Sequence, residues 1–384
     1  MNIKRLIGKL HLWLGLVSGL LMFLISISGA LYAFRDEIFD KLHHNEQHAE
    51  KAGDHTLPLE ELWAIAEETL GAEYPVNYVN TFSDPLRAWE FKAYRYNPDM
   101  VSYFNWCEYD YFVYVDPYSG KVLKLLDHKN EFFHLVKMFH WSFLLNTKYG
   151  QPIVGWTVLV FVITLISGLV LWWPFKRKSK RKSFVIQRTK KWKILNYDIH
   201  NVLGFYSIPF TLILALTGLV WAFKWFMALA YVAVNLSTQR PDTAKVVSAD
   251  LSDKIMGVPY EAVYRQSIKK YPDAYSISIY KAGETEDGTI GTYVKKTKQV
   301  YYKAHLEKFD KYSGKLLSSL SFDDLNRGEK LLRMNYDIHV GAVFGLFGKV
   351  IAFFVALLAA SMPVTGFFIW WYRRRGRNKI RINL

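Results

Sequence analysis

Four long uncharged apolar runs dominate the pattern of hydrophobic and polar positions along this 384-residue chain. Each run has 23 to 25 residues, and a helix of about 20 apolar residues crosses the roughly 30 Å of hydrocarbon in a bilayer. The chain is therefore predicted to be a membrane protein with four transmembrane helices. The runs are Leu12–Phe34, Gln151–Phe175, Ile199–Phe223 and Val350–Tyr372.

The two long segments between these runs, residues 36–130 and 231–326, have the patterns of small α+β domains. The strings "PLEELWAIAEETL" from Pro58 and "PYEAVYRQSIKKYP" from Pro259 place apolar residues at helical spacing after a proline. Stretches such as "YFVYV" and "AYSISIY" alternate in the manner of half-buried strands, with Gly and Pro between them. The predicted fold class is therefore an all-α four-helix transmembrane bundle with two small α+β insertions.

The same order of motifs occurs twice along the chain. The first and third apolar runs end in "SGALYAF" and "TGLVWAF", and the second and fourth end in "SGLVLWWPFKRK" and "TGFFIWWYRRR". Each insertion closes on a related string, "VDPYSGKVL" in one and "FDKYSGKLL" in the other. We therefore expect an internal two-fold sequence repeat in which both halves have the same orientation.

This organisation divides the chain into eight segments. The first half contains transmembrane helix 1, an insertion, and an interfacial segment with transmembrane helix 2, at residues 1–35, 36–130 and 131–175. A basic loop at residues 176–195 connects the halves. The second half contains transmembrane helix 3, an insertion, an interfacial segment with transmembrane helix 4, and a tail, at residues 196–230, 231–326, 327–375 and 376–384.

The positive charges indicate the orientation of the spans. The formal net charge is +15, and three segments without any acidic residue, 1–9, 176–193 and 373–384, hold 19 of the 49 Lys and Arg residues. Basic loops stay on the cytoplasmic side of a membrane, so both termini and the basic loop are predicted inside and both insertions outside. The same distribution argues against nucleic acid as a partner, because the remaining charge is close to neutral.

Four histidines stand at the ends of the apolar runs, two of them in copies of the pentapeptide "NYDIH". His11 and His200 enter from the predicted cytoplasmic side, whereas His140 and His339 lie near the outer face. An ionisable side chain in a span is costly and marks a function by default, and two facing imidazoles are a usual way to hold the iron of a b-type haem. We therefore predict two haem b groups, one ligated by His11 and His200 and the other by His140 and His339. The Asp before each "NYDIH" histidine is expected to cap or steer its ring.

Glycines at matched positions leave room for a flat cofactor. A glycine follows each cytoplasmic-side histidine by four residues, and another follows it by 18 residues, about five helical turns and 27 Å along the helix. Gly15 and Gly204, four residues after the histidines, are predicted to give clearance beside the inner haem. Gly29 and Gly218, 18 residues after the histidines, are predicted to give clearance beside the outer haem. Gly168 and Gly366, in the other two spans, are predicted to serve the inner haem.

Other interpretations of these residues stay open. The histidines and glycines also suit a small-residue packing face between helices, whereas a zinc or copper site is disfavoured because each leaflet offers few Cys, Asp or Glu partners. His134, six residues before His140, is an alternative haem ligand that points about 120° away on a helix, and it is otherwise expected in a supporting or surface position. The string "HHNEQHAEKAGDH" at residues 43–55 suits a transition metal, although a solvated loop is favoured. The aromatic stretch Trp89–Tyr114 is expected to form a strand core rather than a stacking surface.

These motifs resemble the PepSY-associated transmembrane family, whose members are often described as iron-regulated membrane proteins. The resemblance rests on "KLHLWLGL…SGALYAF", "FHWSFLL…GW…SGLVLWWP", "YDIHNVLGFY…LTGLVWAF" and "YDIHVGAVFGLFG…TGFFIWW", with the insertion ends "DPYSGKVL" and "DKYSGKLL", and it covers nearly the whole chain. It implies a multi-pass protein of the bacterial inner membrane whose two insertions are PepSY-like domains in the periplasm. The haem histidines of the family map onto His11, His140, His200 and His339.

The resemblance further implies a dihaem reductase that passes electrons across the bilayer to a ferric siderophore and releases Fe(II) for iron uptake. Such a protein needs haem potentials and a docking surface, so no catalytic acid or base is predicted. The sequence contains no nucleotide-phosphate or flavin motif, and the electron donor is expected to be a quinol or a protein on the cytoplasmic side. The alternative is a non-enzymatic scaffold or regulator whose PepSY-like domains bind a periplasmic partner, and such a protein has no need of the four histidines.

Overall fold

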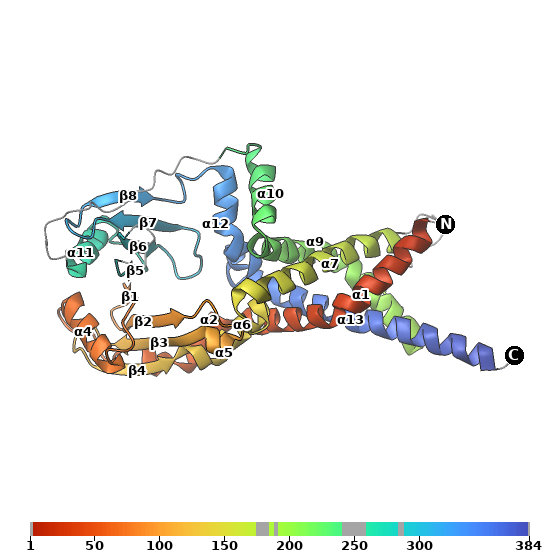
Figure 1. Ribbon diagram of the computed structural model, residues 1–384, viewed down its shortest axis with the longest axis horizontal. Coiled ribbons are helices and arrows are strands. Elements are labelled where there is room, and N and C mark those ends of the chain that lie inside the picture. Colours follow the sequence, from red (N-terminus) through yellow and green to blue (C-terminus); the bar gives the residue numbers. More distant parts are fainter. Residues whose placement is uncertain (1–2, 174–183, 188–190, 240–258, 283–287, 383–384) are drawn as a thin grey trace. The chain divides into compact units, whose positions relative to one another are not determined.

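The computed structural model describes residues 3–173, 184–187, 191–239, 259–282 and 288–382 (Figure 1). The chain divides into two compact units. The transmembrane unit consists of residues 1–33, 136–228 and 338–384, and the sheet unit consists of residues 34–135 and 229–337. Most of the predicted basic loop at residues 176–195 lies outside the described residues.

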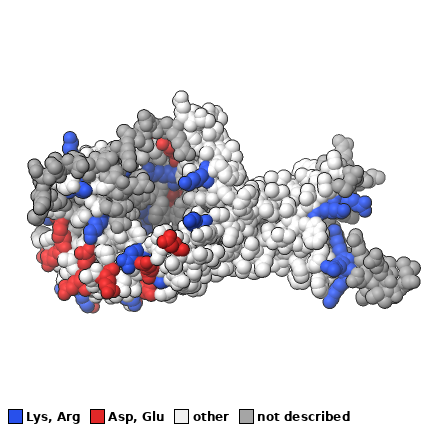
Figure 2. Space-filling model, viewed as in Figure 1, with Lys and Arg blue, Asp and Glu red and all other residues white. Residues whose placement is uncertain are grey.

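The transmembrane unit contains four helices that are long and apolar enough to cross a membrane. They are α1 (Ile3–Tyr32), α7 (Thr147–Trp172), α9 (Trp192–Ala222) and α13 (Gly345–Ile382). Each helix contains most or all of one predicted apolar run, which confirms the four predicted spans as helices of suitable length and composition. Figure 2 shows an uncharged surface along these helices, with Lys and Arg gathered at the end of the bundle where both termini lie.

Shorter helices precede or follow the spans. α6 and α12 lead into α7 and α13, and α10 follows α9; a short 3-10 helix, η3, connects α12 to α13. Their bounds are α6 (Phe132–Ser142), α10 (Lys224–Asn235), α12 (Arg327–His339) and η3 (Ala342–Phe344).

The four spans pack in a ring, in which α1 contacts α7 and α13, and α9 contacts the same two helices. Their shared core includes Met22 of α1, Phe161 of α7, Leu219 of α9 and Ala359 of α13, all of them buried. Lipid tails are as apolar as these side chains, so association of the helices depends on close packing and on polar contacts between them.

Two close approaches of the backbone determine how the chain enters α7 and α13. A Cβ atom on Gly150 would lie 2.1 Å from the carbonyl oxygen of Ser142, at the end of α6. A Cβ atom on Gly348 would lie 2.1 Å from the carbonyl oxygen of Gly341, which itself has a φ of +78°. Only glycine fits at such positions. The first turn brings the end of α6 against the start of α7, and the second brings the residue just before η3 against the start of α13.

The sheet unit holds a single eight-stranded antiparallel sheet in the order β4-β3-β2-β1-β5-β6-β7-β8. The strands are β1 (Tyr78–Phe82), β2 (Trp89–Tyr96), β3 (Cys107–Val115), β4 (Val122–Asp127), β5 (Ser276–Tyr280), β6 (Ile290–Lys295), β7 (Ala304–Phe309) and β8 (Leu316–Leu320). The helices that belong wholly to this unit are α2 (Arg35–Leu42), α3 (His44–Gln47), α4 (Leu59–Leu70), α5 (Tyr103–Trp106), η1 (His128–Asn130) and α11 (Tyr260–Lys270). Trp89–Tyr114 forms β2, α5 and most of β3, as the predicted strand core requires.

The two predicted α+β insertions meet in this one sheet. β1 of the first insertion pairs with β5 of the second along its whole length, with Tyr78 opposite Tyr280 and Phe82 opposite Ser276. The pairing covers an edge strand on each side, and exposed edges are prone to aggregation. The two insertions therefore form one structural unit instead of two separate small domains. The helical bundle and the antiparallel sheet agree with the predicted fold class, and the internal two-fold sequence repeat stays a prediction.

One face of the sheet is covered by the two predicted amphipathic helices, which form α4 and α11 (Figure 1). The rings of Trp63 on α4 and Tyr260 on α11 are stacked with their centres 5.1 Å apart. The carboxylate of Glu261 accepts a hydrogen bond from the backbone N–H of Leu59, the first residue of α4. This connection holds the N-terminus of α4 against α11, and both helices share one apolar core with the strands beneath them.

Cys107 offers a test of the packing of the sheet unit, because it is the single cysteine of the chain and its side chain is fully buried. Burial, together with the nearby charge of Asp110, raises the pKa of its thiol to about 11. Since the thiolate is the reactive form, we expect a disulfide reagent at pH 8 to label the folded protein at least about 100-fold more slowly than the protein in urea. Rapid labelling of the folded protein, followed by absorbance, would contradict this placement of β3.

Candidate functional site

The transmembrane unit brings the four predicted histidines together in two pairs. The ring centres of His11 on α1 and His200 on α9 are 6.5 Å apart, with the rings inclined at 78°. The ring centres of His140 on α6 and His339 on α12 are 6.1 Å apart, with the rings inclined at 55°. The pairs are the two that the sequence predicts, and each pair joins one histidine from each half of the chain.

Every one of these rings lies against a glycine of a neighbouring span. A Cβ atom on Gly29 would lie 2.9 Å from Cε1 of His140, and one on Gly168 would lie 3.0 Å from Cε1 of His11. At the other two histidines the approach is slightly wider. The corresponding distances are 3.4 Å from Gly366 to His200 and 3.7 Å from Gly218 to His339. Side chains larger than hydrogen at Gly29 and Gly168 would displace the rings.

The Nδ1 atom of each ring bonds to the same neighbouring helix that supplies the glycine. The Nδ1 of His11 lies 3.1 Å from the carbonyl oxygen of Thr164 and 3.0 Å from the hydroxyl of Ser167. The Nδ1 of His140 lies 2.8 Å from the carbonyl oxygen of Ile25 and 3.4 Å from the hydroxyl of Ser28. The remaining two rings lie 2.8 Å from threonine hydroxyls, which belong to Thr365 for His200 and to Thr217 for His339.

Carbonyl acceptors determine the tautomer of two of the rings. The carbonyl oxygens of Thr164 and Ile25 can only accept a hydrogen bond, so the N–H of His11 and of His140 lies at Nδ1. At the other two rings each threonine hydroxyl has a carbonyl of its own helix within reach, Ile213 for Thr217 and Ser361 for Thr365, and a hydroxyl that donates to that carbonyl accepts from Nδ1 of the histidine. The hydrogen bonds of these rings in the described part of the chain all use Nδ1, and Nε2 is left as the unprotonated nitrogen that a metal requires.

Sequence reasoning did not assign a role to these four hydroxyl residues. The signal was present, because a serine or threonine stands directly before the glycine in all four motifs that close the apolar runs. Only the packing of the helices shows that the hydroxyl and the glycine serve a histidine on a different helix. The residues are Ser28, Ser167, Thr217 and Thr365.

The other predicted site residues have different neighbours. A Cβ atom on Gly15 would lie 3.8 Å from the side chain of Thr164, and one on Gly204 would lie 3.3 Å from the sulfur of Met362. These two glycines therefore lie at contacts between spans. The carboxylate of Asp337, in the second "NYDIH", accepts hydrogen bonds from the backbone N–H groups of Tyr301 and Tyr302. The ring of His339 is oriented from α9 instead.

His134 does not join the histidine pairs. It is 5% exposed and lies in the sheet unit beside His128, with ring centres 4.1 Å apart, so the expectation of a surface position is wrong. In the histidine-rich string at residues 43–55, His43 bonds to Glu46 and the rings of His44 and His48 lie 4.1 Å apart. Within the described residues that string does not form a group of three metal-ligand side chains.

The residues present fit two haem groups ligated by histidine. A histidine nitrogen binds a transition metal at about 2 Å, so two imidazoles that share one metal have ring centres about 6 Å apart, close to the separations of both pairs. The bound Nδ1 atoms orient the rings, and the supporting hydrogen bonds are those that metal-ligating histidines usually have. Packing of two aromatic rings also occurs at such distances, but it requires neither a common tautomer nor four matched glycines.

The comparisons with known proteins agree with this architecture. The family described as the PepSY-associated TM region matches residues 9–373, which is nearly the whole chain. A search among curated proteins found no match to the chain. The family match, together with four helices of transmembrane length, makes this chain a membrane protein that belongs to the PepSY-associated TM region family.

Proposed function

We propose that this protein is an inner-membrane oxidoreductase that carries two haem b groups and transfers electrons across the bilayer to a ferric siderophore-like complex in the periplasm. The observation that carries the proposal is the repeated arrangement of the four histidines. The ring centres of the two pairs are 6.5 Å and 6.1 Å apart. Each of the four rings contacts a serine-glycine or threonine-glycine dipeptide of a neighbouring span. A scaffold protein has no need of such an arrangement.

In this proposal His11 and His200 hold one haem, and His140 and His339 hold the other. Haem supplies reversible one-electron transfer when it is bound. The side chains of the protein orient the rings through their Nδ1 hydrogen bonds and surround them with apolar helices. Reduction of Fe(III) to Fe(II) weakens its binding to hard oxygen ligands, so the protein needs no acid or base at the reacting centre.

In this proposal the iron complex binds the face of the sheet opposite α4 and α11. Tyr78, Tyr94, Tyr280 and Tyr293 are half-buried on this face. The rings of Tyr78 and Tyr280 lie 4.9 Å apart, and those of Tyr78 and Tyr94 lie 6.4 Å apart. Neighbouring tyrosines offer flat apolar area and hydroxyl groups together, which suits a ligand that combines aromatic rings with oxygen donors.

The orientation in this proposal places both termini in the cytoplasm and the sheet unit in the periplasm. Lys and Arg gather at the end of the bundle where the termini lie (Figure 2), and basic segments stay on the cytoplasmic side. The electron donor is then a quinol or a cytoplasmic-side protein that reaches the His11–His200 end.

Removal of single histidines tests the cofactors and their pairing. The purified protein should show a Soret band and sharp haem bands after dithionite, and His11→Ala and His200→Ala should each lose about half of the haem and spare the other half. His140→Ala and His339→Ala should lose the complementary half, as measured by pyridine haemochrome content and redox titration. His134→Phe is the matched control and should keep all the haem.

Two results would overturn the proposal. A purified protein without a Soret band would remove the reductase and favour a scaffold. Depletion of one common haem by His11→Ala and His140→Ala would show that the histidines pair within each half of the chain instead of between the halves.

The threonine hydroxyls provide an isosteric test of how the rings are held. Thr365→Val and Thr217→Val each remove one acceptor for Nδ1, and loss of such a supporting partner typically weakens metal–ligand binding by about 10- to 100-fold. Thr365→Val should accelerate haem loss from the His11–His200 pair only, and Thr217→Val from the other pair only, with transfer to apomyoglobin as the measurement. Thr211→Val, a buried threonine of α9, is the control, and equal haem loss in all three variants would contradict the assigned role.

Reporter fusions test the orientation. A fusion near residue 185 should be active only with a cytoplasmic reporter, and fusions near residues 70 and 285 only with a periplasmic reporter, because the basic segments remain inside. Alkaline phosphatase activity at residue 185 would reverse the layout.

A further inference from the structure

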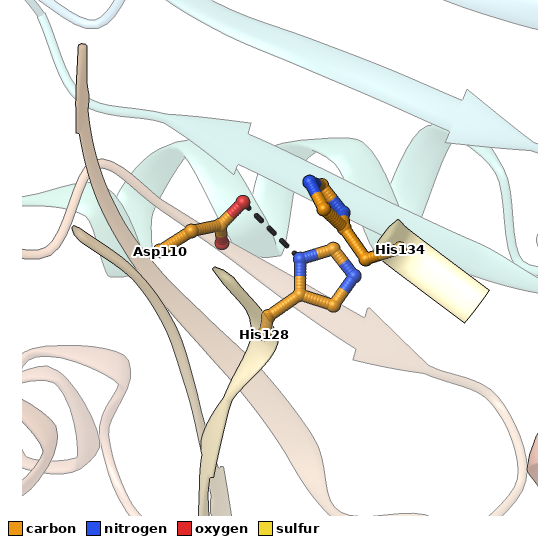
Figure 3. Close-up of side chains that lie close together, drawn as sticks. All are labelled: Asp110, His128 and His134. Atoms are coloured by element: carbon orange, nitrogen blue, oxygen red, sulfur yellow. Dashed lines mark ion pairs between the residues drawn. The ribbon is translucent and has the colours of Figure 1, made fainter. Parts of the chain in front are cut away.

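Three buried side chains converge in the sheet unit, separate from the paired histidines. Asp110 belongs to β3, His128 to η1 and His134 to α6, and their side chains point toward one another (Figure 3). One potential ligand atom from each residue lies within 4.8 Å of the others. Among the described residues this is the one group of three metal-ligand side chains. Their exposed fractions are 0%, 6% and 5%.

The carboxylate of Asp110 has different partners at its two oxygens. The Oδ2 atom lies 3.1 Å from Nδ1 of His128, and the Oδ1 atom lies 3.2 Å from Nζ of Lys92 on the neighbouring strand. One oxygen of this buried carboxylate therefore faces the imidazoles, and the other faces Lys92.

The ion pair between Asp110 and Lys92 does not explain why two imidazoles are buried beside it. Lys92 already supplies one positive charge to Asp110, so charge neutralisation gives no reason to bury His128 and His134 beside it. The two ring centres lie 4.1 Å apart, and one nitrogen of each ring lies within 4.8 Å of the other and of an Asp110 oxygen. A single cation shared by the three ligand atoms accounts for all three side chains.

Aromatic rings pack against both imidazoles of the group. The ring of Phe112 meets His128 edge-on with ring centres 4.9 Å apart, and the ring of Tyr103 lies 5.9 Å from that of His134. Hydrogen bonds to the outer atoms of the ligands are a regular feature of metal sites, and Lys92 supplies one such contact to the carboxylate.

We propose that Asp110, His128 and His134 form a binding site for a divalent transition-metal ion of the zinc class. Two imidazoles and one carboxylate are a ligand set that suits Zn²⁺, with a water molecule in the fourth position. Ligand atoms around a tetrahedral zinc lie about 3.3 to 3.6 Å apart, since each bond is about 2.0 to 2.2 Å. The distance from Oδ2 of Asp110 to Nδ1 of His128 is already near that value. Bringing all three ligand atoms to this spacing requires side-chain shifts of about 1 Å. The inference does not depend on the proposed electron-transfer function.

Zinc content measured on the full chain in detergent tests the site. The purification tag is removed, and metals are removed with EDTA. The protein is then mixed with excess Zn²⁺, dialysed and analysed by inductively coupled plasma mass spectrometry, which measures zinc separately from haem iron. We expect about one zinc per chain for the unaltered protein and less than about 0.2 for Asp110→Asn and for His134→Phe, because three protein ligands are the minimum for such a site.

Matched variants separate this site from other histidines and from unfolding. His305→Phe changes a histidine that is stacked on Tyr271 elsewhere in the same sheet, and His48→Phe changes the histidine-rich string, so both should keep about one zinc. Protection of the Cys107 thiol and the circular dichroism spectrum report whether a variant is folded, and His134→Phe decides the question if Asp110→Asn is unfolded. The proposal is overturned if the unaltered protein retains less than about 0.2 zinc, or if folded Asp110→Asn and His134→Phe retain as much zinc as the unaltered protein.

Discussion

The hydrogen bond from the Nδ1 of a histidine to the backbone or hydroxyl oxygen of a neighbouring span is the interaction on which the transmembrane unit depends. A polar ring among apolar helices is costly unless its N–H has an acceptor. The acceptor can lie close enough only where the neighbouring helix carries no side chain in front of the ring, which is the position of Gly29 and Gly168. The hydroxyl before the glycine lies within hydrogen-bond distance of the same Nδ1 and completes the arrangement. Polar contacts of this kind also help to hold helices together where lipid removes the hydrophobic driving force.

The sheet unit depends on a different constraint, the burial of a sufficient apolar core. Each insertion alone has only four strands and one covering helix. Pairing of β1 with β5 joins them into one sheet, and α4 and α11 then share a core that neither insertion could bury alone. The alternation of strand residues assigns apolar side chains to the helix-covered face. The opposite face receives the tyrosines and the Asp110 carboxylate.

Histidines serve two chemically distinct arrangements in this chain. In the transmembrane unit each ring donates from Nδ1 to a neutral oxygen, which leaves Nε2 unprotonated and the site uncharged. In the sheet unit Nδ1 of His128 lies 3.1 Å from a carboxylate oxygen of Asp110. The first environment suits a neutral ring ligand to haem iron, and the second, with two imidazoles and one carboxylate, suits the proposed transition-metal ion of the zinc class.

The sequence by itself determined the four spans, the two amphipathic helices of the insertions and the four histidines with their pairing, because each depends on local periodicity or on matched spacing along the chain. An uncharged apolar run of more than 20 residues is long enough to cross the hydrocarbon of a bilayer as a helix, which satisfies its own backbone hydrogen bonds. Only the tertiary structure decided that Ser28, Ser167, Thr217 and Thr365 hold rings on other helices, that Gly15 and Gly204 lie at helix contacts, and that the two insertions share one sheet. It also decided that His134 joins Asp110 and His128 although it stands six residues before His140. These outcomes depend on which elements become neighbours, and no local pattern in the sequence records which surfaces will meet.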